Sequence, residues 1–227
     1  MATVADVIKR AMRSLVVLPS GATPTAQEYT DHIETLNGML NLWSTELMAF
    51  APAQVSGSVA ADTASVTVGS GSDIDTTRPV KIVSAYLRDS NSIDYPLDIR
   101  SINEYEDVAL KTVGSLPEIM YIRKGNSEWT LYFDTKTDTS YTLILEVIQP
   151  LATYSASTDT ITAPAEYMDA LVYNLALRIA PEYGVKNIQL VAGLAQNSLA
   201  KIKTLNVHPI PVIKTCASGR SNIYAGV

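Results

Sequence analysis

Few residues in this chain have side chains that could catalyse a reaction or hold a metal. The chain has two histidines, His32 and His208, and one cysteine, Cys216. A zinc site needs several histidine or cysteine ligands at suitable spacing, and this set does not supply them. A cysteine and a histidine can form a catalytic pair, but Cys216 falls in a segment with no helix or strand pattern to hold it. His32 falls on the polar side of a predicted helix, so we expect it to be solvated.

Carboxylates are the other candidates for chemistry. Glu104, Glu106 and Asp107 share one short segment, and a cell-wall hydrolase could use Glu104 or Asp107 for acid–base work. Nothing nearby predicts the burial that would tune such a pair, so an exposed helix face is the simpler interpretation. Asp73 and Asp75 could share a hard cation, but they follow a glycine- and serine-rich stretch that is more simply a solvated linker. We therefore expect no catalytic, metal-binding or cofactor-binding residue.

Charge is divided unevenly along the chain. The net charge is −6, and all 23 acidic residues lie within residues 1–182. Residues 183–227 contain no acidic residue and these basic ones: Lys186, Lys201, Lys203, Lys214 and Arg220. Such a split indicates either that the C-terminal part meets a negatively charged partner or that a few charges are distributed by chance. A DNA-binding module that uses Lys186, Lys201 and Lys203 is one form of the first interpretation.

Composition favours a globular protein. The hydrophobic fraction of 47% is ordinary for a protein with a sizeable core. No apolar run approaches the roughly 20 residues that a membrane helix needs, and the run at residues 15–18 is too short for a signal peptide. A single cysteine excludes an intrachain disulfide. We therefore expect a soluble protein that is made and used without export.

Tyrosine is unusually frequent, with 12 residues against two phenylalanines. A tyrosine buries a large ring while its hydroxyl group tolerates water, which favours interfaces. The tyrosines are spread over the whole chain, so half-exposed positions within a monomer explain them equally well. The sequence leaves both interpretations open.

Helical patterns occur at both ends of the chain. The clearest lies within residues 163–184, where Pro164 fits a first helical turn and Pro181 ends the helix. Between these prolines an apolar stripe recurs at helical spacing: Met168, Leu171, Val172, Leu175 and Ile179. Three more helices are predicted, at residues 3–15, 25–47 and 187–205. Thr3 with Asp6, and Thr25 with Glu28, have the spacing of capping boxes.

The middle of the chain has the alternation of short strands. Strands are expected at residues 55–59, 65–68, 79–88, 93–99, 119–123, 129–133 and 141–148, with a short helix at 101–108. The first two strands read as one hairpin, and 79–88 with 93–99 as another. Within 79–88, Val80, Ile82, Ser84 and Tyr86 should share one face, opposite Lys81, Val83, Ala85 and Leu87. Short, closely spaced strands favour a small antiparallel sandwich or barrel.

Together these patterns predict an α+β protein. Its helical bundle is built from both ends of the chain, residues 1–50 and 160–206. An antiparallel β-rich domain, residues 51–159, is inserted into it. Residues 207–227 form an extended C-terminal arm, because their prolines and glycines disfavour regular structure.

Three segments in this order resemble the head-to-tail adaptor proteins of tailed bacteriophages. They are ADVIKRAMRSLVVLPSGATPTAQEYTDHIETLNGMLNLWSTE, TTRPVKIVSAYLRDSNSIDYPL and EYMDALVYNLALRIAPEYGV. The nearest type is the tail accessory factor that stabilises packaged DNA in short-tailed phages. The resemblance covers residues 5–205 and depends on the combination of segments, because no single motif is diagnostic.

The resemblance implies a structural virion protein that is not an enzyme and needs no cofactor. Such adaptors form a ring, usually dodecameric, between the portal and the tail. They extend the DNA channel, retain the packaged genome and provide a platform for the tail nozzle or fibres. The implied partners are the portal protein, nozzle or fibre proteins, other copies of the chain and, transiently, viral DNA, but no membrane. The implied location is the portal vertex of the virion, after synthesis in the host cytoplasm.

The resemblance also suggests which residues meet these partners. A C-terminal arm in this family commonly reaches along the portal, which assigns portal contacts to Pro209, Pro211, Lys214, Arg220 and Tyr224. Lys186, Lys201 and Lys203 are candidates for contact with DNA in the channel or with a partner. Two alternatives stay open: a cell-wall hydrolase associated with the phage tail, and a weak DNA-binding module.

Overall fold

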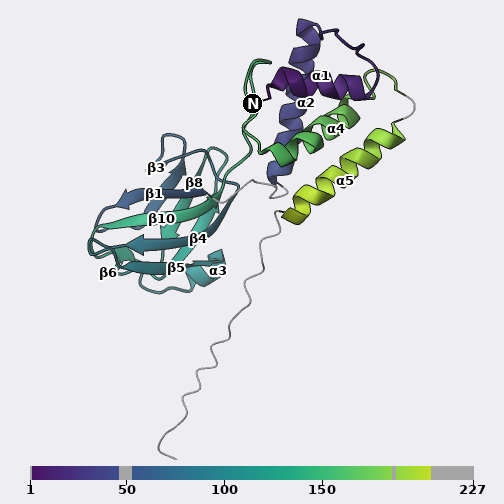
Figure 1. The fold of residues 1–227 in the computed structure, drawn as a ribbon. Coiled ribbons are helices and arrows are strands. Elements are labelled where there is room, and N and C mark those ends of the chain that lie inside the picture. The colour runs from purple at the N-terminus through teal and green to yellow at the C-terminus, as the bar shows by residue number, and fades with distance from the viewer. Residues whose placement is uncertain (1, 46–52, 186–187, 206–227) are drawn as a thin grey trace, which may run out of the picture.

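The computed structural model describes residues 2–45, 53–185 and 188–205 of the chain. The four longer helices gather at one end of the molecule, and the strands lie at the other end together with one short helix, α3 (Ile102–Glu106) (Figure 1). The buried hydrophobic residues fall into two separate clusters, one among the helices and one within the sheet. No helix in these residues is long and apolar enough to cross a bilayer.

The structure corrects the predicted fold class. A helical bundle with an inserted antiparallel β domain is wrong, because the dominant element is a large mixed sheet of eight strands. Its order is β1-β10-β4-β5-β7-β8-β2-β3, and two of its pairings, β5 with β7 and β2 with β3, are parallel. The strands are β1 (Ala53–Val59), β2 (Ser65–Gly69), β3 (Ile74–Asp75), β4 (Lys81–Arg88), β5 (Asp94–Arg100), β7 (Ile119–Lys124), β8 (Glu128–Phe133) and β10 (Tyr141–Ile148).

Two more short strands, β6 (Gly114–Ser115) and β9 (Lys136–Thr137), pair with each other beside the large sheet. The predicted hairpin of the first two strands is wrong, because β1 pairs with β10 and β2 pairs with β8. The predicted hairpin of β4 and β5 is confirmed. Three pairings in this sheet, β1 with β10, β10 with β4 and β2 with β8, therefore join strands that are far apart in the sequence.

The inner face of the sheet is packed with alternate residues of its strands, as period-2 side-chain geometry requires. On β8 the buried residues are Trp129, Leu131 and Phe133. On β4 the buried residues are Ile82, Ala85 and Leu87, which breaks the predicted alternation of faces. The cause is an irregularity in the pairing of β10 with β4 between Glu146 and Val147, since such a bulge moves later residues to the other face.

The two edge strands of the sheet, β1 and β3, approach each other and nearly close a barrel. No backbone hydrogen-bond pairing joins β1 to β3. Their contact is made by the buried side chain of Ile74 against the backbone at Gly57. A Cβ atom built on Gly57 of β1 would lie 2.6 Å from Cγ1 of Ile74 in β3. Any larger residue at position 57 would therefore force Ile74 or one of the two strands to move, because Ile74 occupies the space that a Cβ atom would need.

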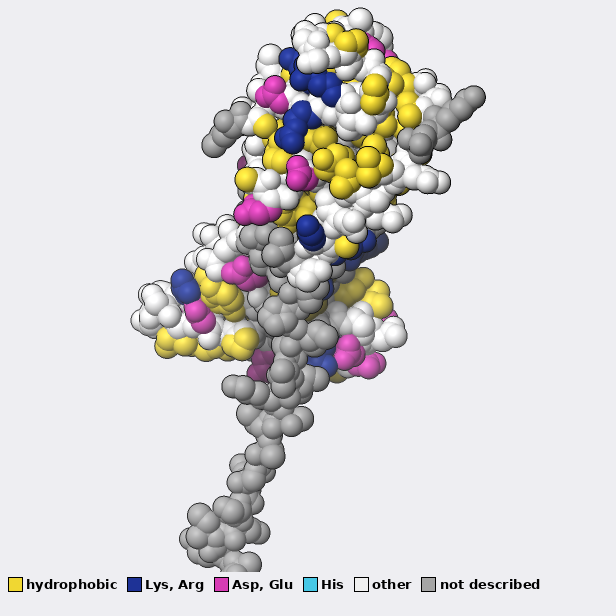
Figure 2. Space-filling model, turned by 45° about the vertical axis from the view of Figure 1, so that its right-hand side comes forward, with side chains coloured by type: hydrophobic (Ala, Val, Ile, Leu, Met, Phe, Trp, Pro, Cys, Tyr) yellow, Lys and Arg dark blue, Asp and Glu magenta, His cyan; other side chains and the backbone are white. Residues whose placement is uncertain are grey.

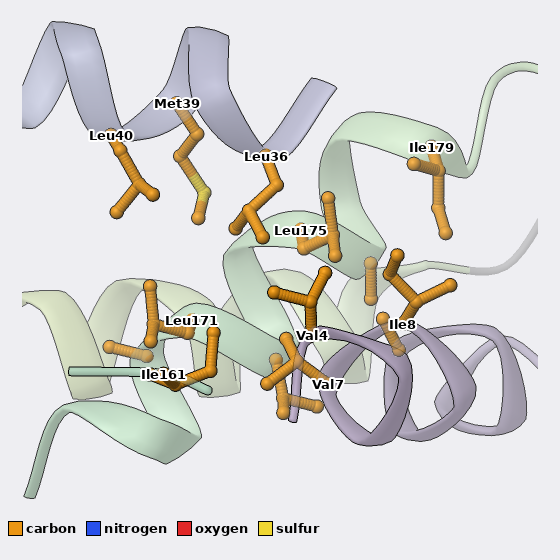
Figure 3. Packing of buried hydrophobic residues seen from close by; sticks show 14 of the residues in the cluster. Val4, Val7, Ile8, Leu36, Met39, Leu40, Ile161, Leu171, Leu175 and Ile179 are labelled. Carbon is orange, nitrogen blue, oxygen red and sulfur yellow. The ribbon is translucent and has the colours of Figure 1, made fainter. Parts of the chain in front are cut away.

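The helices pack around α4 (Met168–Ile179), which follows a 3₁₀ turn at Ala165–Tyr167. Leu171 and Leu175 of α4 lie between Val4, Val7 and Ile8 of the first helix and Leu36, Met39 and Leu40 of the second (Figure 3). These are α1 (Val4–Ser14) and α2 (Ala26–Thr45), and α5 (Gln189–Leu205) packs along α4. The predicted apolar stripe is confirmed at Leu171, Val172, Leu175 and Ile179, which are all buried.

The helix starts are set by side chains, as the capping-box spacing predicts. At α1 the Thr3 hydroxyl accepts from the Asp6 amide, and the Asp6 carboxylate accepts from the Thr3 amide. At α2 the same exchange joins Thr25 and Glu28. Each exchange satisfies amides that a helix start otherwise leaves without a partner. After α4, Gly184 adopts a φ of 59°, which lets the chain turn towards α5.

Candidate interaction surfaces

The carboxylates that could have served a hydrolase belong to α3 (Ile102–Glu106), where Glu104 has a structural role. Its carboxylate accepts from the amide and hydroxyl groups of Ser101 and from the Arg100 guanidinium. The Ser101 hydrogen bonds and Arg100 lower the pKa of Glu104 to about 2. Glu104 is therefore ionised at neutral pH and cannot donate a proton as a general acid. Asp107 stands exposed at the C-terminal cap of the same helix.

His32 is buried, not solvated, with only 1% of its surface exposed. Its Nε2 lies 2.8 Å from the Tyr183 hydroxyl group, which in turn donates to the Glu28 carboxylate. Because the Tyr183 proton goes to Glu28, Nε2 of His32 must be the donor to the Tyr183 oxygen. This chain of bonds joins α2 to the turn between α4 and α5, so it helps to fix where α5 begins.

The surroundings of these hydrogen-bonded side chains shift the pKa values of Tyr183 and Glu28. Burial and the neighbouring Glu28 raise the pKa of Tyr183 to about 12. Hydrogen bonds from Thr25, and then from Tyr183, lower the pKa of Glu28 below its usual range. Both groups therefore keep one protonation state over the physiological range, which suits a structural link.

The lowered pKa of Glu28 predicts a specific acid sensitivity. A carboxyl group whose pKa is lower in the folded state stabilises the fold above its unfolded pKa, and this stabilisation is lost as the pH falls through the folded pKa. Glu28→Gln should therefore make stability depend less steeply on pH between about pH 5 and pH 3. Urea denaturation at several pH values measures this, with Glu34→Gln, exposed on the same helix, as the control. Identical pH profiles for Glu28→Gln and the wild type would contradict the assignment.

Asp73 and Asp75 act as turn-forming carboxylates beside β3. Asp73 accepts from the amide and hydroxyl groups of Thr67, each at 2.8 Å, and these bonds lower its pKa. Asp75 accepts from the Gly71 amide. Within the described residues, no group of three or more metal-ligating side chains gathers.

Of the predicted basic contacts, Lys201 and Lys203 lie on α5, whereas Lys186 lies outside the described residues. Two further groups also lie outside the described residues. They are His208 with Cys216, and the predicted portal contacts Pro209, Pro211, Lys214, Arg220 and Tyr224. Lys201 lines an open cavity of about 650 Å³ together with Asn197, Ala200 and Thr204. This cavity lies along the side of α5 that does not pack on α4.

The outer side of α5 also carries large hydrophobic residues in water. Leu190 is 77% exposed and Leu194 is 38% exposed, one helical turn apart. An adjoining side of α5 buries Val191, Ala195 and Ile202 against the helical cluster. Hydrophobic side chains with Lys and Arg side chains beside them are exposed over the helical part (Figure 2). Apolar residues in this position are typical of a surface that meets another protein.

A second surface lies on the sheet, where three of the twelve tyrosines come together. Tyr121 on β7 and Tyr132 on β8 are paired across the strands, with ring centroids 6.1 Å apart. Tyr105 of α3 lies against both rings, at 5.6 Å from Tyr121 and 6.0 Å from Tyr132. These rings line a cavity of about 380 Å³ with Ile102, Glu106 and Arg123. The sequence could not show this cluster, because it depends on the register of β7 against β8 and on the position of α3.

A comparison with protein families identifies the family of the chain. The model of the SU10 adaptor protein family matches residues 2–208, which is nearly the whole chain. No curated protein matches the sequence. The matched region includes all the described helices and strands, and so both the outer side of α5 and the tyrosine cluster.

Proposed function

Because the chain belongs to the SU10 adaptor protein family, a family of phage head-to-tail adaptors, we propose that its copies form a ring between the portal and the tail. Family membership supports a structural role in the virion neck and interaction with portal and tail components. In the proposed ring, usually dodecameric in such adaptors, the chain extends the DNA channel, retains the packaged genome and provides a platform for the tail nozzle or fibres.

The observation that carries the ring proposal is the outer side of α5. Leu190 and Leu194 are exposed there, on a helix that buries Val191, Ala195 and Ile202 against the helical cluster. Full burial of an exposed leucine contributes roughly 1.5–3 kcal/mol. Leu190 can gain most of this and Leu194, which is only 38% exposed, a smaller part, which makes this side a suitable contact for a neighbouring copy. Lys201, further along the same helix, is then available for contact with a partner or with DNA in the channel.

The C-terminal residues 206–227 are proposed to contact the portal, with Pro209, Pro211, Lys214, Arg220 and Tyr224 as the contact residues. The support for this is compositional, since the last 45 residues carry no acidic side chain. A segment of this kind is attracted to an acidic surface, and its contacts should weaken as salt increases.

The test mixes the protein with portal rings of the same phage and counts assembled particles by negative-stain microscopy. The double variant Leu190→Glu, Leu194→Glu should lose assembly by at least about tenfold, because it puts charge into an apolar contact. Ile93→Glu, at a residue exposed on the β4–β5 hairpin, is the matched control and should assemble like the wild type. Circular dichroism verifies that both variants are folded. Normal assembly of the double variant would overturn the role of α5.

A cell-wall hydrolase is not supported as a second function. Glu104 is engaged in the start of α3, and its pKa of about 2 is unsuited to a general acid. We propose that the protein is not an enzyme. A zymogram on bacterial cell wall tests this directly: clearing that disappears in the Glu104→Ala, Asp107→Ala variant would show the proposal to be wrong.

A further inference from the structure

The stretch of chain around α3 has several exposed hydrophobic residues that the proposed ring contact does not use. Ile99, Ile102, Leu110 and Val113 are exposed large hydrophobic residues, all within one short stretch of the chain. In the part of the chain that the structure describes, only six other large hydrophobic residues are as exposed. Ile102 is the one of these four that also lines the tyrosine cavity. An exposed apolar side chain beside an aromatic cavity is typical of a surface that binds another segment or protein.

The cavity itself has the composition of a peptide-binding groove. Tyr105, Tyr121 and Tyr132 supply aromatic walls, and Ile102 supplies an apolar edge. Among the described residues, neither the Arg123 guanidinium nor the Glu106 carboxylate has a hydrogen-bond or ion-pair partner. An unpaired arginine on an aromatic wall can donate to the carbonyl groups of an extended peptide, whose backbone makes no internal hydrogen bonds.

We propose that this cavity binds residues 207–213 of the chain's own C-terminal segment before the portal is met, and that the portal then takes the segment over. The sequence of this stretch is VHPIPVI, with prolines at positions 209 and 211. Each proline fixes φ near −65° and favours the extended polyproline helix. Aromatic-lined grooves bind such proline-containing peptides because little conformational entropy is lost.

Reach and charge both suit this occupant. The segment begins directly after α5, whose last turn points towards the sheet (Figure 1). Residues 206–227 span at most about 75 Å when fully extended, which allows the segment to serve its own subunit or a neighbour. The Glu106 carboxylate lines the cavity, and Lys214 follows directly after the proposed binding stretch, in a segment without acidic residues. Lys214 can therefore pair with Glu106 when the segment is bound.

The proposal rests on the proposed adaptor function for the release step alone, because binding of the segment needs neither a ring nor a portal. The probe is a fluorescent synthetic peptide of residues 206–215, NVHPIPVIKT. It is titrated by anisotropy into the full-length chain carrying Pro209→Ala and Pro211→Ala, whose own segment can no longer compete. The peptide should bind this chain at least about tenfold more tightly than it binds the wild type, in which the cavity is already occupied.

Three variants in the same background locate the binding site. Tyr121→Ala and, separately, Ile102→Glu should weaken peptide binding by at least about tenfold. Tyr86→Ala, at a half-buried tyrosine on β4 outside the cavity, should leave it unchanged. Ile102 is exposed, so that variant stays informative even where Tyr121→Ala disturbs the fold. If the peptide bound equally well to the Ile102→Glu and Tyr86→Ala chains, the proposed site would be wrong. The proposal would also be wrong if a peptide with both prolines replaced by alanine bound as tightly as the original peptide. If the protein bound the peptide in this way but did not assemble on portal rings, the proposed function would be rejected and this inference would stand.

Discussion

Replacing Gly57 with valine should destabilise the protein by about 1–3 kcal/mol, the usual cost of forcing extra carbon atoms into a packed interior. The first added atom would lie 2.6 Å from Cγ1 of Ile74, far inside van der Waals contact. Ile74 is buried and cannot swing into water, so β1 and β3 must separate. Chemical denaturation in a Trp43→Phe background measures the effect, because Trp129, the other tryptophan, lies in the sheet cluster.

Two controls separate the contact from a general intolerance of glycine replacement. Gly38→Ala, in α2, meets no atom within 4 Å and should stabilise the protein by about 1 kcal/mol through helix propensity. Gly57→Val combined with Ile74→Ala should cost less than the sum of the two single changes, because each relieves the other. Strict additivity of the two would mean that Gly57 and Ile74 do not share one contact.

Leu175→Ala should cost about 2–5 kcal/mol, the range for a leucine deleted from a fully packed core. Leu175 lies at the centre of α4, where α1 and α2 both reach it (Figure 3). No single element can relax to fill the cavity, so the cost should fall in the upper part of that range. Trp43 belongs to the same cluster, so its fluorescence in a Trp129→Phe background reports the loss.

The matched control for this change is Leu190→Ala. It removes the same atoms from a residue that is 77% exposed, so stability should change by no more than about 0.5 kcal/mol. A loss of similar size at both positions would mean that α4 is not central to the helical cluster.

Comparing the Trp43 and Trp129 transitions also tests the predicted domain boundaries. Leu175→Ala should shift the Trp43 transition more than the Trp129 transition if the helical and sheet parts are separate domains.

Local features of the helices could be predicted from the sequence because they are set within a few residues. The pairs Thr3 with Asp6 and Thr25 with Glu28 form capping boxes as their spacing indicates. The stripe of α4 is buried because residues three and four apart share one helix face. These features depend on short-range geometry alone.

The sheet could not be predicted because its partners are far apart in the sequence. Ala53 of β1 pairs with Val147 of β10. Asp98 of β5 pairs in parallel with Ile119 of β7, and α3 lies between these two strands in the sequence. Neighbouring strands were expected to form hairpins, which is correct for β4 with β5 and wrong for β1 with β2. The fold class was wrong for this reason, since the size of the sheet emerges only once all eight strands are joined.

The candidate surfaces divide in the same way. The burial of His32 had a local signal, since His32, Leu36, Met39 and Trp43 recur at helical spacing, but its partner Tyr183 lies 151 residues away. On α5, helical spacing predicts that Leu194 is inside with Val191, Ala195 and Ile202, and this is wrong for Leu194, which is 38% exposed. The tyrosine cavity could not be predicted, because α3 and two strands must first be placed together.

The contact between Ile74 and Gly57 also bears on how the protein survives at high concentration during virion assembly. An uncovered strand edge is a template on which other chains can polymerise into fibrils. In this sheet that contact holds the two terminal strands close to each other. A polar residue at position 74 would expose both edges, so we expect insoluble material to accumulate before any loss of helical structure is detected.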